Sequence, residues 1–170
     1  MNRPEKSEYA EFYAGYISLV EETDIVSALQ SQLTEIEILF AEMPPEKADF
    51  RYAPDKWSVK QLLGHIIDGE RIFAYRALRI ARNDQTPLPG FDENSFMENS
   101  NFNERTIADL LEEFLYVRQA NNIFFKTLDE KAWSNTGTAS DAPVSVRALA
   151  YTMVGHVRHH INILRQRYLI

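Results

Sequence analysis

Apolar side chains recur at helical spacing along four long stretches of the chain, and no strand-like alternation persists anywhere. Because a helix brings every third or fourth residue to one face, such a stripe indicates an amphipathic helix. The stretches run from about Asp24 to Met43, from Ser58 to about Asn83, from about Thr106 to Leu128, and from Ser145 nearly to the end. The pattern predicts an all-α protein, a four-helix bundle.

The ends of these helices carry start and stop signals. Pro44 and Pro45 end the first helix, since proline cannot continue the hydrogen-bond ladder. Ser58 with Gln61 three residues later is a capping-box pattern, which predicts that the second helix begins at Ser58. A polar loop precedes the fourth helix and contains Asn135, Gly137, Ser140 and Pro143.

Two connections shape the expected topology. The segment 84–105 is unusually long and is interpreted as a crossover, which would let the second and third helices run parallel. A short periodic segment at 9–20 predicts a helical N-terminal arm across the bundle. No boundary divides the chain, so we expect a single domain over 1–170, with 1–22 as the arm.

The third helix should bury one stripe, made of Ile107, Leu110, Leu111, Phe114, Val117 and Phe124.

Composition narrows the functional classes. The 170 residues carry a net charge of −7, and an acidic surface argues against nucleic acid as a partner. The chain has no cysteine, which excludes disulfides, cysteine zinc sites and a cysteine nucleophile. No signal peptide and no membrane-spanning run are recognisable, so a cytoplasmic location is expected.

Three of the four histidines of the chain lie close together near its end. With His156 set at zero on the fourth helix, His160 falls at about 40°, inside the apolar stripe, and His159 at about −60°, outside it. His156 and His160 therefore point inward together, at a spacing that suits two imidazoles on one metal. Core histidines with ordinary hydrogen bonds are the simpler alternative, but two buried imidazoles side by side need a shared partner.

A third metal ligand must come from a facing helix, and His65 is the remaining histidine. It lies at the margin of the apolar stripe of the second helix, and Gly69 one turn later leaves room beside it. Three imidazoles from two helices would leave coordination positions open, which is typical of catalytic metal sites. Imidazole ligands suit Zn, Ni, Fe or Cu.

Other polar and aromatic residues are weaker candidates. Asp68 is the catalytic candidate, because it follows His65 by three residues and would orient an imidazole or act as a base. A salt bridge with Arg71 is the alternative. Arg76, about 16 Å further along the helix, would bind an anionic substrate group or pair with a carboxylate. His159 is expected at the surface, at a subunit contact or in a hydrogen bond. Trp57 and Trp133 are expected to be core aromatics at helix edges rather than residues that stack on a ligand. The loop from Phe91 to Phe102 is expected to pack over the bundle, and a place at the mouth of a pocket is its alternative.

Two segments resemble the signatures of the DinB-like superfamily. The stretch from Trp57 to Asp68, WSVKQLLGHIID, is similar to its second-helix signature, and GHVRHHINIL, from Gly155 to Leu164, is similar to its C-terminal signature. The run from Phe73 to Arg82 followed by Pro87–Phe91 resembles one subgroup. The resemblance covers the chain from about Asp24 onward.

This resemblance implies a bundle with a long crossover and a divalent metal, nickel or zinc, on His65, His156 and His160. It also implies a homodimer. Some members of the family are metal-dependent transferases that use low-molecular-weight thiols, and others are described as hydrolases. We therefore expect a metal-dependent transferase or hydrolase acting on a small-molecule substrate, with or without a thiol cosubstrate. The alternatives are a non-catalytic bundle tied together by a structural ion and a bundle with protonatable core histidines.

Overall fold

The computed structural model describes residues 2–170 and is mostly helical. Its four long helices are α2 (Ile25–Ala41), α3 (Val59–Ala81), α5 (Ile107–Lys126) and α7 (Val146–Ile163). The shorter helices are η1 (Lys6–Glu8), α1 (Glu11–Ser18), η2 (Pro45–Lys47), α4 (Glu93–Glu98), η3 (Phe102–Glu104), α6 (Glu130–Ser134) and a final π-helical turn, η4 (Leu164–Tyr168). No helix within 2–170 is both long and apolar enough to cross a membrane.

Each long helix begins directly after a capping side chain. The side chains of Asp24, Ser58, Thr106 and Ser145 each accept a hydrogen bond from the backbone N–H three residues later. At Ser58 the bond is reciprocal, because the Gln61 side chain accepts from the Ser58 N–H at 3.0 Å. These caps satisfy backbone donors that have no partner inside the helix. The capping box predicted from the sequence is confirmed.

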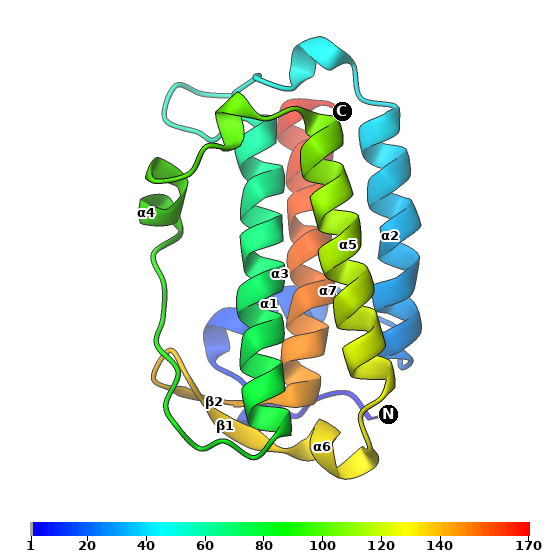
Figure 1. The fold of residues 1–170 in the computed structure, drawn as a ribbon, viewed down its shortest axis with the longest axis vertical. Coiled ribbons are helices and arrows are strands. Elements are labelled where there is room, and N and C mark those ends of the chain that lie inside the picture. Colours follow the sequence, from blue (N-terminus) through cyan, green and yellow to red (C-terminus); the bar gives the residue numbers. More distant parts are fainter. Residues whose placement is uncertain (1) are drawn as a thin grey trace.

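The helices form a four-helix bundle with a crossover (Figure 1). Helices α3 and α5 run in the same direction, and α2 and α7 run in the opposite one. The connection from α3 to α5 returns along the outside of the bundle and carries α4. Helix α1 packs on α7 as the expected N-terminal arm. Since α7 also packs on α3 and α2, most of its residues are buried, His156 and His160 among them.

The loop expected before α7 is in fact a β-hairpin. Strands β1 (Thr136–Ala139) and β2 (Ala142–Ser145) pair antiparallel, with Thr136 opposite Ser145. Ser140 and Asp141 both have positive φ, which is the geometry of a two-residue hairpin turn. Strands of four residues are too short to show a period of two, and Gly137 and Pro143 are typical of loops. The Leu88 backbone bonds to Thr138 and Ser140, which attaches the crossover to this hairpin.

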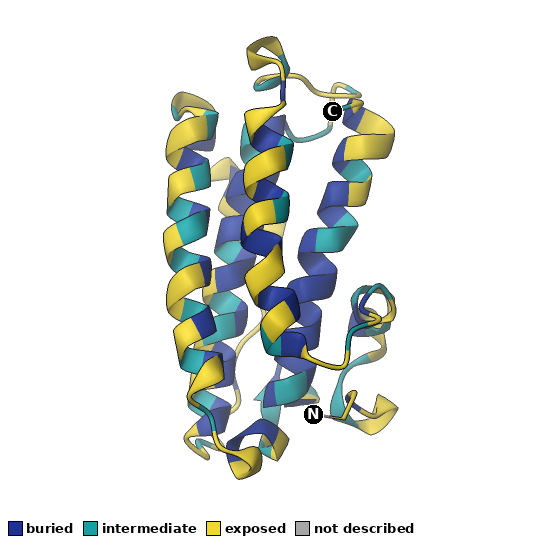
Figure 2. Ribbon diagram, turned by 90° about the vertical axis from the view of Figure 1, so that its right-hand side faces the viewer, coloured by how far each residue is buried: buried dark blue, intermediate teal, exposed yellow. Residues whose placement is uncertain are grey.

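The third long helix buries a different stripe from the predicted one. Its buried residues are Leu110, Phe114, Arg118, Asn122 and Phe125, whereas Val117 and Phe124 are only half buried. The prediction was wrong here because it assumed that buried positions are apolar. As Figure 2 shows, buried positions of the long helices face the interior and exposed ones lie outside.

The buried Arg118 is the centre of a polar network within the apolar core. Its guanidinium binds both carboxylate oxygens of Glu70 on α3, at 2.8 and 2.5 Å. It also donates to the side chain of Gln32 on α2, which in turn donates to the Val154 carbonyl on α7. This network around one salt bridge therefore links all four long helices through hydrogen bonds.

Helix α1 approaches α7 closely at Gly155. A Cβ at this position would lie 2.0 Å from the backbone oxygen of Tyr16, so any side chain must displace α1. We expect Gly155→Ala to destabilise the protein by about 1–3 kcal/mol, as overpacked cores do, measured by urea denaturation. Gly15→Ala is the matched control, because a Cβ there meets nothing within 4 Å and alanine favours a helix. Equal stability of the two variants would contradict this account of the α1–α7 contact.

Candidate metal centre

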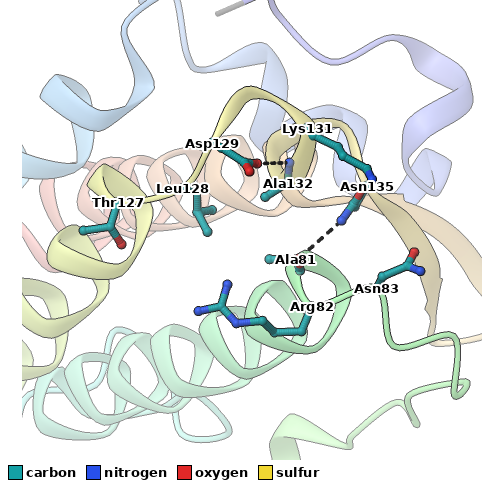
Figure 3. A pocket seen from close by; sticks show the side chains of 9 residues that line it. All are labelled: Ala81, Arg82, Asn83, Thr127, Leu128, Asp129, Lys131, Ala132 and Asn135. Atoms are coloured by element: carbon teal, nitrogen blue, oxygen red, sulfur yellow. Dashed lines mark hydrogen bonds between the residues drawn. The ribbon is translucent and has the colours of Figure 1, made fainter.

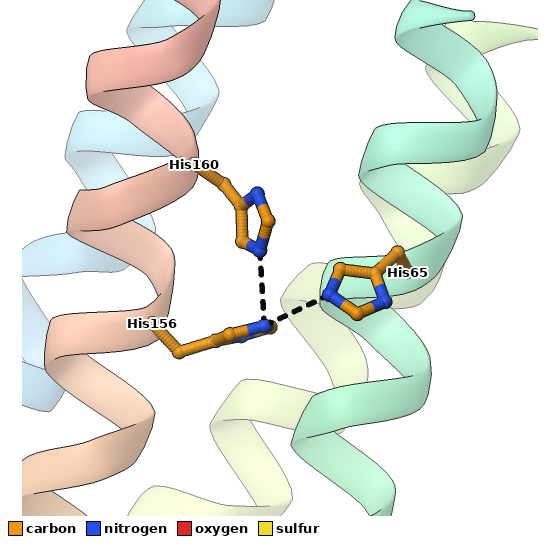
Figure 4. A group of neighbouring side chains, drawn as sticks. All are labelled: His65, His156 and His160. Carbon is orange, nitrogen blue, oxygen red and sulfur yellow. Dashed lines mark hydrogen bonds between the residues drawn. The ribbon is translucent and has the colours of Figure 1, made fainter. Parts of the chain in front are cut away.

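Three histidine side chains converge between α3 and α7 (Figure 4). The Nε2 atom of His156 lies 3.0 Å from Nε2 of His65 and 3.1 Å from Nε2 of His160. The helical spacing on α7 brings His156 and His160 together, and α3 supplies His65 from the opposite side. Gly69 leaves room for His156 rather than for His65, beside which the space was expected, since a Cβ there would lie 2.9 Å from the His156 ring.

The electrostatic surroundings keep these imidazoles neutral. Burial lowers the pKa of His65 to about 4, with a smaller contribution from His159. Burial, followed by the neighbouring histidines, lowers the pKa values of His156 and His160 well below the usual range. Neutral imidazole is the form that binds a metal ion.

The three histidines fit a metal ion. One potential ligand atom from each lies within 4.8 Å of the others. Tetrahedral coordination at Zn–N distances of about 2.0–2.1 Å requires ligand nitrogens about 3.3 Å apart. The Nδ1 atoms of His156 and His160 are buried without a hydrogen-bond partner among the described residues. If those Nδ1 atoms carry the protons, the facing Nε2 lone pairs repel one another, and a cation between them removes the conflict.

A cavity of about 430 Å³ opens onto this cluster. All four histidines line it, together with aromatic rings from distant parts of the chain. Tyr16 of α1 lies edge-on to His156 and His159, at centroid distances of 5.4 and 5.2 Å. Burial raises the pKa of Tyr16, and the negative charge of Glu93 adds to the effect. Tyr16 therefore keeps its hydroxyl hydrogen beside the cluster.

Of the two tryptophans and the fourth histidine, Trp57 and His159 lie at the cavity and Trp133 does not. Trp57 lines the cavity and packs on His65 at 4.8 Å between ring centroids, whereas Trp133 is a core residue stacked on Phe125. His159 is half buried in the cavity wall but lies outside the ligand set.

Asp68 lies away from the cavity that the histidines line. It lines a separate depression with Phe96 and Phe102, and burial raises its pKa. No hydrogen bond joins its carboxylate to a histidine within the described chain. Its role as an orienting group or base stays a prediction.

A second cavity, of about 440 Å³, lies where α3 ends and α6 begins (Figure 3). Two of its polar side chains stabilise helix ends: Asp129 caps α6 by accepting from the Ala132 N–H, and Asn135 donates to the Ala81 carbonyl at the end of α3. No histidine lines it. The histidine cavity is therefore the better candidate for chemistry.

Several cavity residues escaped the sequence analysis because they come from the arm, the crossover and the hairpin. They are Tyr13, Tyr16, Glu93 and Ser140, whereas Phe73, which also lines the cavity, comes from the long helix α3. The one available signal was the recurrence of aromatic residues in the predicted arm, at Tyr9, Phe12, Tyr13 and Tyr16, because rings at helical spacing indicate a face that packs against something. For the loop from Phe91 to Phe102, a place at a pocket mouth was the alternative interpretation, and Phe91 does line this cavity. Nothing local to the sequence indicated that the hairpin would reach it.

Comparisons with known proteins agree with this architecture. The family model of the DinB superfamily matches residues 28–164, which is most of the chain. The structure is similar to that of YfiT from Bacillus subtilis, described as a probable metal-dependent hydrolase with an unusual four-helix bundle topology. The TM-score is 0.67 at 19% identity, covering 98% of this chain and 93% of that one. No curated protein matches the sequence.

Proposed function

The chain belongs to the DinB superfamily, and from this membership and the site geometry we propose that it is a metal-dependent enzyme acting on a small molecule. His65, His156 and His160 would hold a divalent ion, nickel or zinc, through their Nε2 atoms. One observation carries the proposal: the three nitrogens converge in the wall of a cavity of about 430 Å³. That volume is ordinary for a small-molecule site.

The protein would position the substrate and shield it. A divalent metal supplies the positive charge that makes a water or a thiol nucleophilic near neutral pH. The rings of Trp57 and Tyr16 hold the imidazoles of His65 and His156 in place and exclude water from one side of the cluster. The protonated Tyr16 hydroxyl is available to donate to a substrate oxygen that gains negative charge.

Hydrolysis and thiol transfer would use the same three ligands. YfiT is described as a probable hydrolase, which makes hydrolysis the first reaction to test. The resemblance to thiol-dependent members of the superfamily supports the second test, transfer from a low-molecular-weight thiol. Homodimer formation is proposed on the same basis and is measurable by analytical ultracentrifugation.

Metal removal separates this proposal from a purely structural ion. Because the hydrophobic core and the Arg118 network hold α3 and α7 independently of the cluster, we expect chelated protein to keep its helical circular dichroism. Hydrolysis of ester or amide substrates, or thiol transfer, should be lost on chelation and return with nickel or zinc. Complete unfolding on chelation, with no activity in any reconstituted form, would favour the structural ion.

A further inference from the structure

Arg76 of α3 is a buried cation near the histidine cavity. Only 2% of the residue is exposed. Its guanidinium donates to the Tyr13 hydroxyl at 3.1 Å, the Pro89 carbonyl at 2.7 Å and the Ser140 hydroxyl at 3.0 Å. None of these partners is a carboxylate, and no ion pair of Arg76 is present within residues 2–170.

The contrast with Arg118 shows that Arg76 lacks a directly paired carboxylate within the described chain. Both arginines are among the largest fully buried side chains, but Arg118 is neutralised by Glu70 through two hydrogen bonds. A guanidinium stays charged in proteins, and a buried charge is costly unless it is paired. The three neutral acceptors satisfy hydrogen bonds of Arg76 without cancelling its charge. A negative group would therefore be favoured nearby.

The hydroxyls of Tyr13 and Ser140 lie between the Arg76 guanidinium and the cavity, and the hydrogen bonds from Arg76 polarise them. Both residues line the cavity that the histidines line. Each hydroxyl oxygen accepts a hydrogen bond from Arg76, so its own hydrogen remains available. Neither hydroxyl donates to an acceptor within the described chain. Two polarised O–H donors are thus held at one end of the cavity.

The stretch between these hydroxyls and the histidines is aromatic. Phe73 lies edge-on to Tyr13 at 6.1 Å and to His156 at 5.5 Å, and it lines the cavity. The Phe91 ring faces the Arg76 guanidinium at 6.0 Å. Because the single Phe73 ring bridges Tyr13 and His156, a molecule that reaches from the hydroxyls to the histidines is shorter than the axial separation of His65 and Arg76, about 16 Å.

We propose that Tyr13 and Ser140, positioned and polarised by Arg76, form a subsite for the carboxylate of the substrate. The inference rests on the proposed function, because it adds the substrate class: a monoanionic carboxylate joined by an apolar segment to the group that reacts at the histidines. One guanidinium compensates one charge. Glu93 at the cavity edge opposes a second negative charge, so a dianionic phosphate fits less well.

The test compares carboxylates with their neutral amides. Isothermal titration calorimetry would measure binding of a series from 3-phenylpropionate to 6-phenylhexanoate and of the matching primary amides, on zinc-loaded and chelator-treated protein. We expect at least one carboxylate to bind on the order of tenfold more tightly than its amide in both forms, since charge-assisted hydrogen bonds exceed neutral ones.

Substitutions at three residues should weaken carboxylate binding more than amide binding, because the carboxylate makes charge-assisted hydrogen bonds and the amide makes neutral ones. Tyr13→Phe and Ser140→Ala each remove one hydroxyl and should lower the ratio of carboxylate to amide affinity severalfold. Arg76→Gln should abolish the preference for carboxylate, and Arg76→Lys, which keeps the charge, should retain part of it. Tyr151→Phe is the control, since that buried tyrosine donates to the Glu22 carbonyl away from the cavity. The two hydroxyl variants keep the test informative if Arg76→Gln fails to fold.

The results also separate this subsite from the metal centre. If the preference for carboxylate requires zinc and is unchanged by the substitutions at Tyr13, Ser140 and Arg76, the carboxylate binds the metal. This result overturns the subsite and leaves the metal centre in place. Equal affinity for acid and amide, or no binding by any member of the series, also overturns it. A hydroxyl-dependent preference in protein that takes up no metal would support the subsite and contradict the proposed function.

Discussion

Replacing His65, His156 or His160 by alanine should lower the affinity for nickel or zinc by at least about a hundredfold. Loss of a residue that merely supports a metal ligand costs about 10–100-fold, and loss of one of three ligands should cost more. The structure brings one ligand nitrogen from each histidine within 4.8 Å of the others, so each variant leaves only a two-histidine site. Elemental analysis and competition with a chromophoric chelator measure the change.

His159→Ala is the matched control for these variants. His159 lies on the same helix and lines the same cavity, but it does not belong to the converging group. The His159→Ala variant should therefore bind one metal ion per chain, as the unchanged protein does. A His65→Ala/His160→Ala double variant that also keeps one ion per chain would show that the metal is held elsewhere.

Part of this site could be predicted from the sequence because it depends on helical phase alone. The i, i+4 spacing of His156 and His160 fixes them on one face of α7 whatever the rest of the chain does. The position of His65 depends on how α3 packs against α7, which spacing cannot supply. Its assignment came from the count of histidines and from the resemblance.

The helix ends were also predictable, because capping is local chemistry. Ser58 and Ser145 directly precede α3 and α7, as the sequence indicated. The hairpin, α4 and α6 were missed because the two strands have four residues each and the two helices six and five, too few for a periodicity to be seen. Residues such as Ser140 reach the cavity only through long-range packing of the hairpin, so no local pattern marks them.

The error in the third long helix has a more specific physical cause. Sequence periodicity assigns buried positions to apolar residues, but α5 buries Arg118 and Asn122. Arg118 is fully buried because Glu70 on a different helix neutralises it. A partner so far away in the sequence is not recognisable without the structure. The energetic consequences of this pair can be measured.

Arg118→Met should destabilise the protein by about 3–5 kcal/mol, the cost of leaving one member of a buried ion pair without its partner. The substitution leaves the carboxylate of Glu70 in the core with only the Asn121 amide, at 3.1 Å, as a hydrogen-bond donor. It also removes the donor to Gln32, which loosens the link between α5 and α2. Urea denaturation followed by circular dichroism measures the free energy of unfolding.

Two further variants identify the uncompensated charge as the cause. Arg71→Met makes the same chemical change in a half-exposed pair with Glu113 and should cost at most about 1 kcal/mol. The double variant Arg118→Met/Glu70→Leu should be more stable than Arg118→Met alone, because it removes the stranded carboxylate and fills its place with apolar atoms. If instead the second substitution adds its own full cost, the energy of this network lies in packing and hydrogen-bond geometry rather than in charge compensation.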